Sequence, residues 1–172
     1  MTPLLDGRHH ALVNFRDFIH DGRHHAYRWV DVKKFQLLDT PCDDERLLES
    51  LIGHEWFRDD YAGGGVDSAG ARHGPYWLDR VTVPAYEPVD ERTALAGLRT
   101  WADHNGMLPP PLRYALDREV YAQVRAATSR YRLKDLGETA WHDWGGVHGE
   151  FHELVLIGRQ TGSLVLIVAA DD

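Results

Sequence analysis

Two unbroken apolar runs near the end of the chain constrain the fold more than any other feature. They occupy residues 154–157 and 164–169 and are joined through residues 159–162, which end in Thr161-Gly162. A strand with one face in water alternates apolar and polar residues, and neither run does so. We therefore expect an antiparallel hairpin that is covered on both faces and lies at the centre of a sheet.

A second hairpin is predicted over residues 12–32. Aromatic and β-branched residues flank Asp21-Gly22, a pair that accepts the positive φ angles of a type I′ turn. In that register His20 faces Arg23. Neither face of this hairpin is consistently apolar, so we expect it at an edge of the sheet or projecting from it.

Apolar residues at helical spacing predict three helices: residues 41–59 with Thr40 as N-cap, a helix that follows Asp90 and ends at Asn105-Gly106, and residues 112–131. Residues 76–84 alternate as in a strand. Residues 61–75 are rich in glycine and aperiodic, and we expect a loop that is mobile or ordered by a ligand.

These elements predict one layered α+β domain spanning residues 1–172. A chain of this length buries one core and leaves too little for a second domain of ordinary size. The expected architecture is a largely antiparallel sheet of about five strands with three helices packed on it.

Composition and charge exclude several classes of function. The net charge of −8 argues against a general nucleic-acid binder, because phosphate contacts need clustered positive charge. No apolar run approaches the ~20 residues of a membrane helix, and no segment resembles a signal peptide. Cys42 is the only cysteine, which suits a reducing compartment, and arginine outnumbers lysine sixteen to three, as in proteins of GC-rich genomes. We expect a soluble, cytoplasmic bacterial protein without a membrane partner.

The strongest candidate chemistry lies just ahead of the first apolar run. If the strand begins near Val147, then His148, Glu150 and His152 project to one side and could hold a zinc or iron ion, or act as acid and base. His142 is a possible further ligand. The HExxH zinc motif is absent. The alternative is that these side chains bond backbone groups at the rim of the sheet.

Two other features are weaker candidates. The glycines of residues 63–72 superficially look like a phosphate cradle, but no Lys-Ser/Thr pair follows them. Cys42 is followed by acidic residues that oppose thiolate formation, so we expect packing and not nucleophilic catalysis. Arg72 and His73, in the glycine-rich loop, join His142 and Glu150 as the predicted ligand-binding residues.

Three functional hypotheses follow. The first is a protein-binding or regulatory module without catalytic activity or cofactor, which meets a protein partner or a second copy of itself. It is motivated by seven acids against two arginines in residues 43–60 and six bases against three acids in residues 112–135. The second is a metal-dependent hydrolytic enzyme using His148, Glu150 and His152. The third is a small-molecule-binding protein whose cavity lies between the sheet and residues 62–75.

Overall fold

A six-stranded antiparallel sheet organises the molecule. The computed structural model describes residues 3–20, 27–39 and 41–171. Within them the strand order is β1-β2-β8-β7-β6-β5. The strands are β1 (Leu5–Asn14), β2 (Arg28–Leu37), β5 (Tyr86–Pro88), β6 (Ser129–Leu133), β7 (Phe151–Gly158) and β8 (Ser163–Asp171). The α+β class and the largely antiparallel sheet are confirmed, with one strand more than expected.

The two apolar runs form the centre of this sheet, as predicted. They lie in β7 and β8, which pair with each other, and β8 also pairs with β2. Leu166 and Ile167 are adjacent in β8, point to opposite faces and are both fully buried. The unbroken run of apolar residues in the sequence therefore indicates a strand that is covered on both faces.

The N-terminal strands form the hairpin expected at the sheet edge. β1 pairs with β2 in the register that the predicted turn implies, with Ala11 opposite Val32. The ladder stops at Asn14, because Phe15–Asp17 form a single 3-10 turn instead of continuing the strand. The Asp21-Gly22 turn and the pairing of His20 with Arg23 fall outside the described residues.

The first two helices begin at acidic N-caps. α2 (Glu91–Ala102) starts after Asp90, as predicted, and the Asp90 side chain accepts the Thr93 N–H at 2.7 Å. α1 (Asp44–Gly53) is shorter at both ends than the predicted helix. Asp43 caps it by accepting the Arg46 N–H at 2.9 Å. The predicted cap, Thr40, lies outside the described residues.

The third predicted helix is real but ends early. α3 (Pro110–Leu116) continues through a π-helical turn, Asp117–Tyr121, into α4 (Ala122–Ala126). The prediction that it reaches residue 131 is wrong, because Ser129–Leu133 form β6 and pair with β7.

The strand predicted at residues 76–84 is also wrong. Only Tyr76–Trp77 (β4) is extended, and it pairs with β3 (Arg72–His73) in a separate two-stranded ribbon. Two 3-10 turns follow, Leu78–Arg80 and Val83–Ala85. Pro84 lies in the second turn, and a proline lacks the N–H that a strand ladder needs.

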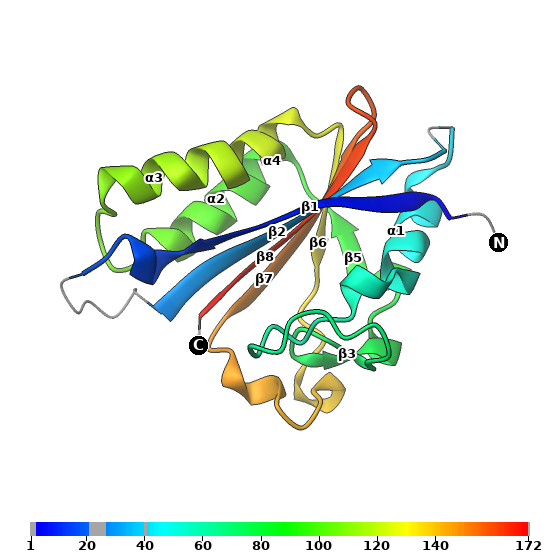
Figure 1. Cartoon of the computed structure of the whole chain (residues 1–172), viewed down its shortest axis with the longest axis horizontal. Coiled ribbons are helices and arrows are strands. Elements are labelled where there is room, and N and C mark those ends of the chain that lie inside the picture. The colour runs from blue at the N-terminus through cyan, green and yellow to red at the C-terminus, as the bar shows by residue number, and fades with distance from the viewer. Residues whose placement is uncertain (1–2, 21–26, 40, 172) are drawn as a thin grey trace.

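The sheet is covered by different material on its two faces (Figure 1). α2, α3 and α4 pack on one face. α1 covers part of the other face together with the irregular segments that precede β5 and β7. On this second face the apolar surface is interrupted by three buried charged residues, Asp31 and Lys33 of β2 and Glu153 of β7.

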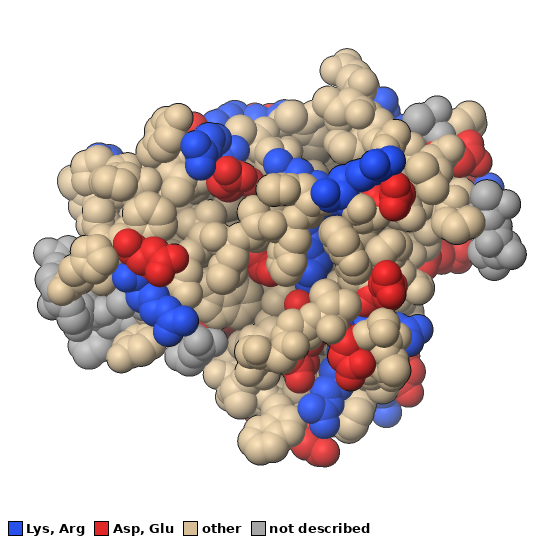
Figure 2. Space-filling view, in the orientation of Figure 1, with Lys and Arg blue, Asp and Glu red and all other residues tan. Residues whose placement is uncertain are grey.

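Basic and acidic side chains are interspersed on the face seen in Figure 2, where no large patch carries a single sign. Among the helices of the described ranges, none combines the length and the hydrophobicity that crossing a bilayer requires.

Candidate functional site

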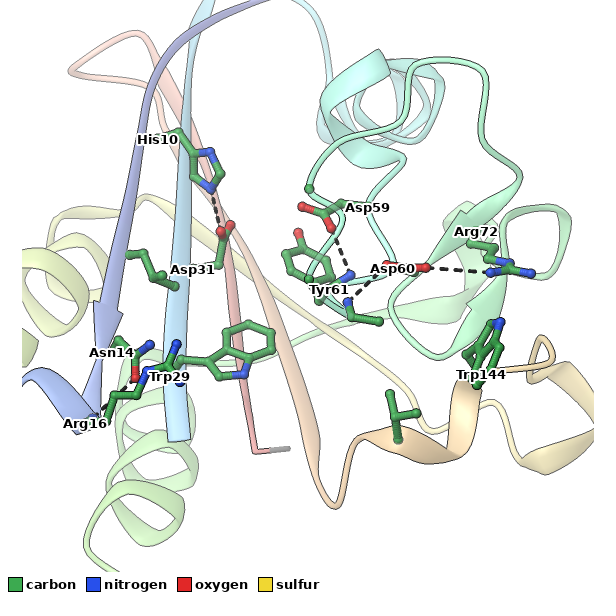
Figure 3. Close-up of a pocket in the computed structure, with 15 residues that line it drawn as sticks. His10, Asn14, Arg16, Trp29, Asp31, Asp59, Asp60, Tyr61, Arg72 and Trp144 are labelled. Atoms are coloured by element: carbon green, nitrogen blue, oxygen red, sulfur yellow. Dashed lines mark hydrogen bonds and ion pairs between the residues drawn. The ribbon is translucent and has the colours of Figure 1, made fainter. Parts of the chain in front are cut away.

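A cavity of about 680 Å³ lies against the second face of the sheet, beside its β1–β2 edge (Figure 3). One wall is made by side chains of β1 and β2, including His10, Trp29 and Asp31. The segment 59–65 and Arg72 form another wall, and Trp144 closes the far side. The cavity therefore joins segments that are distant in sequence.

A buried lysine organises the polar groups beneath the cavity. The Lys33 side chain is 0% exposed, and its Nζ donates to Asp59 Oδ2 at 2.8 Å and to the Tyr61 hydroxyl at 3.0 Å. The same ammonium lies 3.7 Å from Asp31 Oδ1. A buried charge is tolerated only when it is paired in this way, so Lys33 fixes the positions of the groups around it.

Asp31 is the carboxylate with an incomplete set of partners. Its Oδ2 contacts His10 Nε2, whereas its Oδ1 is buried and has no hydrogen-bond partner among the described residues. Burial raises the pKa of Asp31 and outweighs the lowering effects of the Lys33 charge and the His10 hydrogen bond. Asp31 Oδ1 is thus a buried acceptor atom behind the cavity wall that no described side chain satisfies with a hydrogen bond.

Tyr61 has an unusual backbone. Its φ of 57° makes it the only non-glycine residue with positive φ in the described ranges, a conformation that costs energy and clusters at functional sites. Its N–H donates to Asp59 Oδ1 at 2.8 Å, and its ring stacks on Trp29 at 5.7 Å. Burial, followed by the charges of Asp31 and Asp59, raises its pKa well above 10.0, so the hydroxyl stays protonated.

A second buried network lies beside the first. His73 Nε2 is 2.5 Å from Glu153 Oε2, its Nδ1 is 2.6 Å from the Phe57 carbonyl, and Tyr86 donates to Glu153 Oε1 at 2.5 Å. Both ring nitrogens of His73 thus face oxygen atoms. The His73 ring meets Tyr61 edge-on at 6.0 Å, which links the two networks.

Two of the predicted ligand-binding histidines have no ring nitrogen left for a ligand. His73 is fully buried and bonded at both nitrogens, as described above. His142 is buried, its Nε2 donates to the Gly74 carbonyl at 2.7 Å, and its Nδ1 accepts the Trp144 N–H at 3.0 Å. Both side chains hold other parts of the protein in place, and His142 ties two loops together.

The predicted metal site is not formed. β7 begins at Phe151 instead of near Val147, so alternation does not extend back to His148. His148 packs against Trp29 at 6.1 Å and bonds the Asp60 carbonyl at 3.0 Å, whereas His152 faces Trp101 at 6.3 Å. Throughout the described ranges, no three His, Cys, Asp or Glu side chains are placed to hold a metal ion.

The remaining two candidates have different surroundings. Arg72 lines the cavity, 3.7 Å from Asp60 and with its guanidinium 5.6 Å from the Trp77 ring. Glu150 is exposed and outside this cavity, and its Oε2 is 3.4 Å from His152.

The residues at the centre of the site were missed by sequence reasoning. A usable signal was present in β2, where Asp31 and Lys33 occupy alternate positions between Trp29 and Phe35. All four share one face of the strand, and opposite charges within an apolar stripe indicate a buried polar site. Nothing in the sequence links that stripe to Asp59.

No protein family model matches the chain, and no curated protein sequence matches it. Among solved structures it is similar to the crystal structure of citrus MAF1, with 11% sequence identity and a TM-score of 0.44 over 92% of this chain and 94% of that chain. The class defined by the structure itself is an α+β domain with a polar cavity beside one sheet edge.

Proposed function

We propose that the protein binds a small organic ligand in the cavity between the β1–β2 edge and residues 59–65. The observation that carries the proposal is the placing of the buried polar side chains of Asp31, Asp59 and Tyr61 along a cavity of about 680 Å³. Small-molecule sites commonly measure ~300–1,000 Å³ and combine apolar walls with a few convergent polar groups. Trp29 and Trp144 supply aromatic wall area here.

The energetics of the same residues support a functional role. A desolvated carboxylate at position 31 and positive φ at Tyr61 both lower stability. Such features persist when the surrounding structure fixes them, and they concentrate at ligand sites. A purely structural edge of the sheet would be more stable with apolar side chains at these positions.

The other hypotheses have less support. The small-molecule hypothesis is supported by a cavity that residues of the sheet and of the segment 59–65 line together. The protein-binding hypothesis, with its cytoplasmic location and bacterial source, stays a prediction. Part of its acidic surface is used internally, since Asp44 accepts from Arg159 at 2.5 Å and from Tyr131 at 2.6 Å. For the hydrolytic enzyme hypothesis, the part of the chain that the structure describes contains no group of three His, Cys, Asp or Glu side chains that could hold a metal ion.

A matched pair of variants tests the proposal. Leu12 lines the cavity and is 57% exposed, whereas Leu38 is 51% exposed and lies elsewhere. Fragments that bind the wild-type protein should perturb the amide resonances of Gly63 and Gly65 and protect residues 59–65 from proteolysis. Leu12→Trp should weaken this binding at least tenfold by filling the cavity, and Leu38→Trp should leave it unchanged.

Two outcomes would contradict the proposal. One is a fragment screen whose binders all map outside residues 59–65 and the β1–β2 edge. The other is equal affinity in Leu12→Trp and wild type, because the larger side chain must displace any occupant of the cavity.

A further inference from the structure

A second groove lies beside the β3–β4 ribbon, and no described residue lines both this groove and the ligand cavity. It measures about 610 Å³ and is lined by Arg58, by Gly70 and Ala71, and by residues 77–80. The Leu78 N–H donates to the Ala71 carbonyl at 2.8 Å, which holds the last two stretches together. The proposed function does not involve this groove.

Arg58 is a partly buried cation without a carboxylate partner. Its Nη1 donates to the Ser68 carbonyl at 3.0 Å, and this bond is exposed to solvent, so the end of the guanidinium is accessible from the groove. Among the described residues, no Asp or Glu forms an ion pair with it. A partly buried charge gains more from a partner than a fully exposed one, because water and salt screen it less.

Arg80 places a second guanidinium on the same groove. It is the last residue of the 3-10 turn Leu78–Arg80, and it is exposed. Within the described ranges its side chain makes no ion pair and no hydrogen bond. Each guanidinium offers a planar fork of N–H donors that matches the geometry of a carboxylate.

The lining of the groove carries an excess of positive charge. Asp79 is the one acidic residue among the described residues of the lining, and it forms no ion pair with either arginine. Two arginines therefore stand against one exposed aspartate. In a protein whose net charge is −8, this local excess favours an anion in the groove over other parts of the surface.

The rest of the lining is apolar, and Trp77 supplies its aromatic wall. Two side chains from outside the groove hold the Trp77 ring in place: the Arg72 guanidinium lies 5.6 Å from it, and the His142 ring meets it edge-on at 5.9 Å. Tryptophan offers a large apolar surface on which a flat ring can pack. We infer that the groove binds a small aromatic carboxylate, whose charged group pairs with Arg58 and Arg80 and whose ring lies against Trp77.

Two probes of one shape test the inference. 2-Naphthoate and 2-naphthamide share a fused ring and a planar head group, but only the first is charged. We expect 2-naphthoate to bind about tenfold more tightly, because each exposed ion pair contributes about threefold, with resonance shifts at the Trp77 indole and the Gly70 amide. Arg58→Gln and Arg80→Gln should each weaken its binding about threefold. Arg46→Gln, at an exposed position outside the groove, should leave it unchanged.

The inference is independent of the proposed function, and the outcomes keep the two apart. Equal binding of 2-naphthoate and 2-naphthamide at Trp77 would overturn it, as would a preference for 2-naphthoate that is undiminished in folded Arg58→Gln and Arg80→Gln. If the shifts caused by 2-naphthoate map to Gly63 and Gly65 and not to Trp77, the groove is not its site and the ligand cavity is. The wild-type comparison of the two probes needs no variant, so it decides the question even if Arg58→Gln folds poorly.

Discussion

Asp31 illustrates how one residue sets a conflict between stability and binding. Burial raises its pKa above the ordinary 3.8, because the charged form is desolvated, and the Lys33 charge compensates only in part. The folded protein therefore holds the Asp31 proton more tightly than the unfolded chain does. The stability that this provides is present at low pH and is lost as the pH rises through the folded pKa. At neutral pH the ionised carboxylate is a net cost.

Asp31→Asn should accordingly stabilise the protein. We expect a rise in Tm of about 2–4 °C near pH 7, which corresponds to roughly 1 kcal/mol in a chain of this size. The difference between variant and wild type should shrink as the pH is lowered and Asp31 becomes protonated. Thermal unfolding followed by circular dichroism over a pH series measures this. A lower Tm for the variant at neutral pH would show that the ion pair with Lys33 outweighs desolvation.

At the scale of elements, the segment between β6 and β7 (residues 134–150, the β6–β7 segment) holds the cavity wall in place. Gly145 lies in the 3-10 turn Gly145–Val147, directly under Trp141 and against the Pro75 carbonyl. A Cβ at position 145 would lie 2.7 Å from the Trp141 Cβ, closer than the Cβ atoms of folded proteins come to non-bonded atoms. A Cβ at the neighbouring Gly146 would have its nearest contact at 3.6 Å, with an atom of the Trp141 ring.

Gly145→Ala should therefore destabilise the protein by about 1–3 kcal/mol, the usual effect of overpacking. Gly146→Ala should change stability by less than about 0.5 kcal/mol, as at most unconstrained surface positions. Chemical denaturation of the two variants measures the contrast. Equal free energies of unfolding for the two variants would mean that the β6–β7 segment shifts without cost and does not fix the position of Trp144.

Elements were predictable where their signal is local. The hairpin of residues 154–169 and the helix after Asp90 follow from short-range patterns that no distant contact overrides. The errors arose where pairing with distant residues decided the outcome. Val120, Val124 and Tyr131 keep near-helical steps across the end of α4, yet Tyr131 belongs to β6 because it pairs with Val155 of β7.

The candidate site was less predictable than the fold for a related reason. Arg72, which was predicted as a ligand-binding residue of the glycine-rich loop, lines the cavity. His148 and His152 share a spacing that suggested a common side, but the strand begins after His148. Asp31 and Asp59 meet through Lys33, and no rule of spacing connects a strand to a loop more than twenty residues later.

At the scale of the whole molecule, the sheet belongs to two cores at once. β7 and β8 place Leu156 and Ile167 in the core under α2 to α4, and Val155 and Leu166 in the core on the other face. If the elements that cover one face of the sheet unfold, the apolar side chains on that face of β7 and β8 are exposed to water. The two faces should therefore depend on each other for stability.

We expect one cooperative unfolding transition. Trp101 reports on the helical face and Trp56 on the other, so tryptophan fluorescence and far-ultraviolet circular dichroism should give the same midpoint. Two separated midpoints would show that the layers unfold independently and that the single α+β domain is two cooperative units.

The place of β8 between β2 and β7 has a consequence for synthesis on the ribosome. β2 leaves the exit tunnel early, but the strand that completes its hydrogen bonding is translated about 125 residues later. Until then the nascent chain carries an unpaired strand edge beside exposed hydrophobic side chains. This state is prone to aggregation with other chains. Assembly of the sheet must therefore wait for the last strand, and we expect chaperone dependence to end only once Ser163–Asp171 has emerged.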